Sequence, residues 1–184
     1  MNTATPHFVS VSAIAAALQA QLQLVKLVDG VTAAFEQVEL FDSENLTEAF
    51  QLLLLNAKRL AVIVPLDSKW EDYNKSRSNR LMVFRTIPMI VIVSDRVLGA
   101  RQDALYGTAT TPGAYGLEAL ALPFITGQII DNPNGVVSRP VNSSVLIVKN
   151  NTDKKNLPGR AALAIELECQ GGWMETFLAA GPSL

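Results

Sequence analysis

The sequence predicts an α+β fold in which helices cover one face of a mainly antiparallel sheet. Three observations lead to this prediction. The 184 residues are 49% hydrophobic and 17% charged, which is long and apolar enough for one domain, residues 1–184, with a sizeable core. Two segments carry apolar residues at helical spacing, and several apolar runs have the length of strands. These runs are Leu60–Leu66, Met82–Val93, Ser144–Lys149 and Ala161–Cys169.

The first half of the chain predicts a helix, a strand, a second helix and a buried strand. Ser10–Val25 is amphipathic, and Ser10 is a suitable N-cap. Phe35–Phe41 mixes apolar with polar residues, as a half-exposed strand does. Asn45–Ala57 has a wide leucine-rich face and runs almost directly into Leu60–Leu66, whose continuous β-branched character indicates an interior strand.

The second half predicts mostly strands. Leu81–Val97 has a strand-like pattern that contains Pro88, and because proline donates no hydrogen bond, this position indicates a bulge, a bend, a strand boundary or an edge. Glu118–Ile130 is compatible with a short helical turn or a strand. Ser144–Lys149 and Ala161–Cys169 predict an antiparallel hairpin with a long connection.

Three long connections separate these elements: Asp67–Arg80, Leu98–Leu117 and Asn150–Arg160. Connections beyond roughly 12–15 residues are usually functional or disordered. Leu98–Leu117 holds four glycines and a proline, so we expect irregular structure there. We interpret the connections as arms through which a small folded body reaches its neighbours.

The sequence offers few groups for catalysis. Cys169 lies in an alternating apolar run and is expected to pack in the core, and one cysteine cannot build a thiolate zinc cage. The lone histidine, His7, lies near the N-terminus. Glu166 and Glu168 have the spacing of a solvated strand face. With neither a phosphate loop nor a nucleophile motif, we expect no enzyme, cofactor or metal, and the N-terminal segment predicts no signal peptide or membrane span.

Two readings remain open for the charged residues. A small-molecule enzyme would need a pocket, for which Asp95, Arg96 and Glu118 are the best candidates. The arginines at run boundaries and in the arms could instead line a pore or bind DNA phosphates, or be ordinary surface charges. They are Arg77, Arg80, Arg85, Arg96, Arg101, Arg139 and Arg160.

Aromatic residues and arginines in the connections are the candidates for an interface with another subunit or partner. Trp70 and Trp173 are typical interface anchors, and Trp173 heads an apolar C-terminal tail after Gly172. Arg160 either ends a tight turn or reaches a neighbour's carboxylate. The full candidate set is Trp70, Tyr73, Arg80, Arg96, Tyr106, Tyr115, Arg160 and Trp173.

This layout resembles the tail terminator, or tail-completion, family of tailed bacteriophages. The resembling parts are the helix Ser10–Val25, the strand Phe35–Phe41, the helix Asn45–Ala57 running into Leu60–Leu66, an antiparallel core with a long inserted loop, and the last strand Ala161–Cys169.

The resemblance implies a hexameric ring on the end of the tail tube that stops tube polymerisation and meets the head connector or neck protein. It implies a virion protein assembled in the host cytoplasm, with DNA passing through the lumen without sequence-specific binding, no membrane and no catalytic residues. A neck connector or another tail structural subunit is the alternative.

Overall fold

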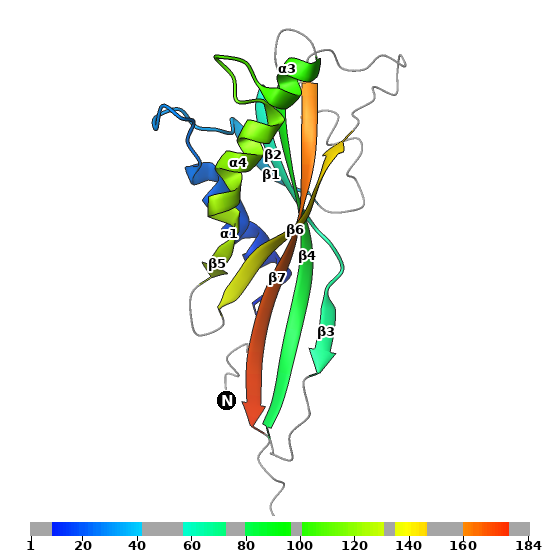
Figure 1. Ribbon diagram of the computed structural model, residues 1–184. Helices are drawn as coiled ribbons and strands as arrows, with labels where there is room; N and C mark the ends of the chain where they lie inside the picture. Colours follow the sequence, from blue (N-terminus) through cyan, green and yellow to red (C-terminus); the bar gives the residue numbers. More distant parts are fainter. Residues whose placement is uncertain are drawn as a thin grey trace, which may run out of the picture.

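The computed structural model describes residues 9–41, 57–72, 80–96, 101–130, 135–146 and 160–176. In chain order the elements are α1 (Val11–Leu24), β1 (Gln37–Leu40), β2 (Arg59–Pro65), β3 (Lys69–Asp72), β4 (Arg80–Arg96), α3 (Arg101–Tyr106), α4 (Gly113–Ile125), β5 (Gly127–Ile130), β6 (Val136–Leu146) and β7 (Arg160–Thr176). The predicted α+β class is confirmed, because helices pack against one mostly antiparallel, curled sheet (Figure 1).

The strands follow the order β1-β2-β4-β7-β6-β5, and β3 lies beside β4 off this path. β1 and β2 are parallel, and the other described pairs are antiparallel. β4 and β7 pair without interruption from Arg80 opposite Thr176 to Arg96 opposite Arg160. These two long strands form the spine of the molecule (Figure 1). The predicted antiparallel pairing of the last two strands is confirmed as β6 with β7.

Helix α1 and strand β1 form where the sequence predicts them. Ser10 caps α1, with its hydroxyl oxygen accepting the N–H of Ala13 at 3.1 Å. The Gln19 side chain then donates to the carbonyl of Val38 at 2.8 Å and so joins the helix to β1. Most of the predicted helix Asn45–Ala57 lies outside the described residues, so the structure does not test it.

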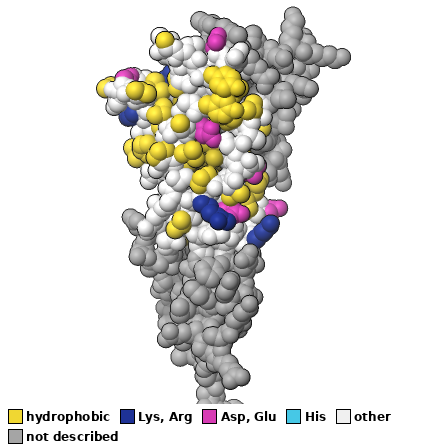
Figure 2. Space-filling model, viewed as in Figure 1, with side chains coloured by type: hydrophobic (Ala, Val, Ile, Leu, Met, Phe, Trp, Pro, Cys, Tyr) yellow, Lys and Arg dark blue, Asp and Glu magenta, His cyan; other side chains and the backbone are white. Residues whose placement is uncertain are grey.

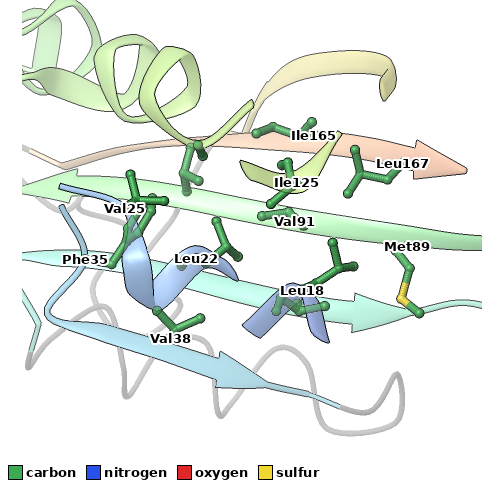
Figure 3. Close-up of a cluster of buried hydrophobic side chains, with 14 of the residues drawn as sticks. Leu18, Leu22, Val25, Phe35, Val38, Met89, Val91, Ile125, Ile165 and Leu167 are labelled. Atoms are coloured by element: carbon green, nitrogen blue, oxygen red, sulfur yellow. The ribbon is translucent and has the colours of Figure 1, made fainter. Parts of the chain in front are cut away.

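The main core lies between the helices and one face of the sheet (Figure 3). Leu18 and Leu22 of α1 and Ile125 of α4 pack against Val91 of β4 and Ile165 of β7, and all five are buried. Removing such a side chain from water stabilises the fold by roughly 1.5–3 kcal/mol. Other buried members include Phe35, Val38, Met89, Leu167 and Cys169, so the core position predicted for the cysteine is confirmed.

The opposite face of the central strands is apolar as well. Leu60 and Val62 of β2, Ile92 of β4 and Ala162 of β7 form a second buried cluster. Strands that are buried on both faces carry continuous apolar runs instead of alternating ones. This explains the run Leu60–Leu66 and confirms β2 as an interior strand.

Pro88 does not interrupt β4. β2 pairs with β4 only as far as Met89, and β3 begins its pairing at Thr86, so Pro88 lies between these two partners. Its carbonyl accepts the N–H of Leu66 on that side. Because a residue's N–H and C=O point the same way in an antiparallel strand, the missing donor of Pro88 faces this gap. Of the alternatives drawn from the sequence, a local edge is the correct one.

The prediction of irregular structure over Leu98–Leu117 is wrong. It contains α3 and the start of α4, joined by a turn in which Thr108 and Thr111 pair. Gly107 and Gly113 both have positive φ, and a Cβ on Gly113 would lie 2.2 Å from the backbone nitrogen of Gly107. The glycines therefore allow two chain segments to touch at the start of a helix. The ambiguous Glu118–Ile130 holds the end of α4 followed by β5.

The connection Asp67–Arg80 also contains regular structure, because Lys69–Asp72 form β3. The predicted tail after Gly172 is likewise a strand as far as Thr176. Together with residues 80–86 of β4, β3 and residues 170–176 of β7 make a three-stranded extension that we call the ribbon. Figure 1 shows the ribbon running beyond the helices.

Candidate assembly surface

Two of the predicted interface residues meet in the structure. Tyr106 ends α3 and Tyr115 lies in the first turn of α4, and their ring centroids are 5.5 Å apart. The side chains are 65% and 39% exposed, respectively. The Gly107–Pro112 turn brings them together. This proximity is not predicted from the sequence, where the glycines and the proline of the connection indicate irregular structure. The pair is an exposed aromatic surface of the kind that binds protein partners.

The two tryptophans occupy the ribbon on either side of β4. Trp70 of β3 is opposite Arg85, and Trp173 of β7 is opposite Val83. Positions 83 and 85 are two residues apart, so the register places both tryptophan positions on one face of the ribbon. Arg80 begins β4 opposite Thr176. Tyr73 lies outside the described residues.

Arg160, in contrast, is directed into its own subunit. It is 3% exposed and donates to the Ser94 hydroxyl at 3.1 Å and to the carbonyl of Ala57. Burial lowers the pKa of the guanidinium to about 10, so it is still charged at neutral pH. These contacts hold the start of β7 against β4 and against Ala57, which precedes β2. They use the guanidinium donors that could otherwise reach a neighbour's carboxylate.

Asp95 lies near Arg160 and binds backbone N–H groups of its own subunit. Its carboxylate accepts the N–H of Gly113 at 3.0 Å and the N–H of Arg96 at 2.8 Å. The residue is fully buried, and burial raises the pKa of its carboxyl group. Asp95, Arg96 and Glu118 were the candidates for an enzyme pocket, but the Asp95 carboxylate is occupied by backbone donors at the start of α4 and at the end of β4.

The outer face of β7 carries the paired glutamates. Arg139 of β6 donates to Glu168 at 2.5 Å, and Asn142 donates to Glu166 at 3.3 Å. Glu166 is exposed and Glu168 half-buried. Glu166 and Glu168 therefore lie on a solvated strand face, as predicted.

The most distinctive surface is one edge of β6. β5 pairs with β6 only over Val136–Ser138, and in the described part of the chain no other strand continues along that side. From Arg139 to Val145 every residue of β6 is exposed. We call Pro140–Leu146 the open segment. It carries no charged residue, and Val141 and Val145 are 55% and 39% exposed.

The open segment was only partly visible in the sequence. The prediction began the strand at Ser144, whereas β6 begins at Val136. The polar stretch Asn142–Ser144 hid the earlier half, and the pairing shifts by one residue between Pro140 and Asn142. A β-bulge of this kind breaks the alternation on which a strand prediction depends.

A second exposed region lies at two neighbouring turns. Val28 and Val31 are almost fully exposed at the first turn, which Asp29 holds by accepting the N–H groups of Val31 and Thr32. A hollow of about 350 Å³ separates this turn from the turn at Thr108–Pro112. Figure 2 shows hydrophobic side chains spread among polar ones over this face of the described body.

The sequence matches no protein-family model and no curated protein. None of the helices in the described ranges is long and apolar enough to cross a membrane. Within the same ranges, no three His, Cys, Asp or Glu side chains lie together as a metal site would require.

Proposed function

We propose that this protein is a structural subunit that assembles with copies of itself into a closed ring, and that the ring is the terminator of a phage tail. In this role it caps the tail tube, stops tube polymerisation and presents a surface to the head connector. The observation that carries the proposal is the open segment of β6, an uncharged strand edge left exposed.

An exposed strand edge presents unpaired N–H and C=O groups to any other extended chain. Monomeric proteins protect such edges with charges, prolines or a covering element. The open segment has Pro140 at its start but no charge after it, and Val141 and Val145 add exposed apolar surface. A ring of identical subunits buries every such edge, because closed symmetry leaves no subunit at an end.

Several titratable groups of the described residues are held by contacts within the fold, which supports a structural role. Asp95 and Arg160 are buried and hydrogen-bonded within the fold, and Glu168 pairs with Arg139. The tail terminator assignment within this class rests on the resemblance in the order of helices and strands. Its expected partners are the tail tube protein, the head connector or neck protein, and DNA passing through the ring.

Charged substitutions in the open segment test the proposal. We expect Val141→Lys with Val145→Lys to reduce ring formation at least tenfold, because lysines on a strand edge oppose edge pairing. Val137→Lys is the matched control, since Val137 is 52% exposed on the same strand but lies where β5 already pairs. Light scattering after size-exclusion chromatography measures the assembly, and electron microscopy shows its form.

The wild-type chain is examined alone and with purified tail tubes. Single rings, in solution or at tube ends, support the proposal. A chain that stays monomeric in both samples contradicts it, and so do open stacks, which would indicate a tube subunit. Equal assembly of the double variant and the Val137→Lys control would show that the open segment is not the contact.

A further inference from the structure

We propose that the open segment of β6 pairs with β3 of the next subunit, so that the ribbon of one copy extends the sheet of its neighbour. The occupant of the open edge is thus a second copy of this chain. This inference rests on the proposed ring and specifies which edge of the neighbour completes it.

β1 is the terminal strand on the other side of the sheet, but its outer edge is partly occupied. The Gln19 side chain donates to the carbonyl of Val38, and Val38 is buried. α1 also packs along β1 and β2. A strand added to this edge would have to displace a hydrogen bond and a packed helix, which makes β1 a poor partner.

β3 has no such cover among the described elements. It pairs with β4 on one side, and no described strand lies on its other side. Arg85 of β4 donates to the Ser68 hydroxyl at 3.0 Å, which holds the residue just before β3. β3 therefore offers a positioned edge at the base of the ribbon. It carries the charged residues Lys69, Glu71 and Asp72, and the open segment has no charged residue that would repel them.

The direction and stagger of the two edges suit a closed sheet. The register within the subunit makes β6 antiparallel to a neighbour's β3. Ser143 is level with Val91 across β7, and Trp70 is opposite Arg85, so six positions of β4 separate the two edges. Pairing Ser143 with the neighbour's Trp70 thus shifts each subunit by about 20 Å along its strands.

Four strand spacings separate β3 from the neighbour's β3, by way of β4, β7 and β6, which is about 19 Å at the spacing of sheet strands. A shift as large as the width corresponds to a strand tilt of about 45°, and closed sheets have tilts of roughly 35–45°. If a neighbour's β1 paired with β6 at residues that are level across the sheet, such as Gln37 with Leu146, there would be no stagger between subunits.

The same shift leaves room for the rest of the neighbour. Pro65, the end of β2, is opposite Met89, and Leu146 is level with Ser94 across β7. After a shift of six positions, the neighbour's Pro65 lies one position beyond Leu146. Its β2 and β1 therefore continue past the end of β6 instead of overlapping it. The pairing also brings the Trp70 position next to the apolar edge residues of β6, and tryptophan is frequent among residues that dominate interfaces.

Disulfide cross-linking of the assembled protein tests this arrangement. In the proposed register Ser144 faces the neighbour's Lys69, and both residues are exposed. We expect Lys69→Cys with Ser144→Cys to give disulfide-linked multimers under oxidation, with at least half of the chains cross-linked. The native Cys169 is a silent background because it is buried and burial raises the pKa of its thiol to about 11.

Two further variants distinguish the alternatives. Glu39→Cys with Ser144→Cys reports pairing with β1, because these two residues are level across the sheet. Ser144→Cys alone reports pairing of β6 with a second β6. Suppose that rings form. The β3 assignment is then overturned, while the ring proposal stands, if Lys69→Cys with Ser144→Cys does not cross-link more than these two variants, or if no variant cross-links. A wild-type chain that is monomeric alone and with tail tubes overturns both.

Discussion

At the residue scale, Asp95 and Arg160 are charged residues whose burial the sequence did not predict. Asp95 and Arg160 flank predicted connections, where charges are usually solvated, yet both are buried and bonded to the backbone. Their burial follows from their positions at the paired ends of β4 and β7, because these two strands cross the core. Periodicity alone cannot show that a charged side chain turns inward, because the partners come from distant segments.

The raised pKa of Asp95 predicts a specific pH dependence. Burial favours the protonated carboxyl in the folded state, so the stability that this group contributes is lost as pH rises from 3.8 through its raised pKa. We expect the free energy of unfolding of the wild type, relative to Asp95→Asn, to fall across that range. Denaturant unfolding at a series of pH values measures both proteins.

Asp29 provides a control of opposite sign. It is exposed, and its hydrogen bonds from Thr32 and Val31 hold the pKa of the carboxyl below 3.8. The wild type should therefore gain stability over Asp29→Asn as pH rises towards 3.8. The same direction of change for both substitutions would show that Asp95 is not desolvated as described.

At the element scale, apolar spacing located most strands and α1 but failed at α4. Its buried residues Ala114, Leu117, Ala121 and Ile125 follow helical spacing. Gly113, Gly116 and Pro112 masked the first turn, because glycine and proline normally indicate a loop. The glycines serve a close approach of two backbones, which depends on tertiary contact and is not encoded in local propensity.

Alanine substitutions test the role of these glycines. Gly107→Ala would place a Cβ 2.5 Å from the carbonyl oxygen of Pro112 at positive φ, so we expect a loss of roughly 2–4 kcal/mol in the free energy of unfolding. Gly30→Ala has a similar φ with nothing within 4 Å, and should cost only about 1–2 kcal/mol. Thermal and denaturant unfolding compare the two, and equal losses would mean that the turn can open without penalty.

At the scale of the whole molecule, two of the three predicted arms contain regular structure, and the third, Asn150–Arg160, lies outside the described residues except for Arg160. Asp67–Arg80 contains β3, and Leu98–Leu117 contains α3 and the start of α4, while the part of the molecule that reaches outward is the ribbon. The ribbon could be anticipated only in part, since Met82–Val93 and Ala161–Cys169 were recognised as strands but their extension and β3 were not. Edge exposure of β6 could not be anticipated at all, because it depends on where β5 stops.

The composition of the open segment makes a last prediction about assembly. Pro140–Leu146 contains no charged residue, so its contact with a neighbour depends on backbone hydrogen bonds and apolar burial. Salt screens charge pairs but leaves these contributions intact, and apolar burial does not weaken as ionic strength rises. We therefore expect the ring to persist between 0.1 M and 1 M sodium chloride, with its dissociation constant changing by less than about threefold. Light scattering across a dilution series at each salt concentration measures this constant. A loss of affinity of tenfold or more at high salt would show that ion pairs hold the subunits together, and would move the contact away from the open segment to charged surfaces elsewhere.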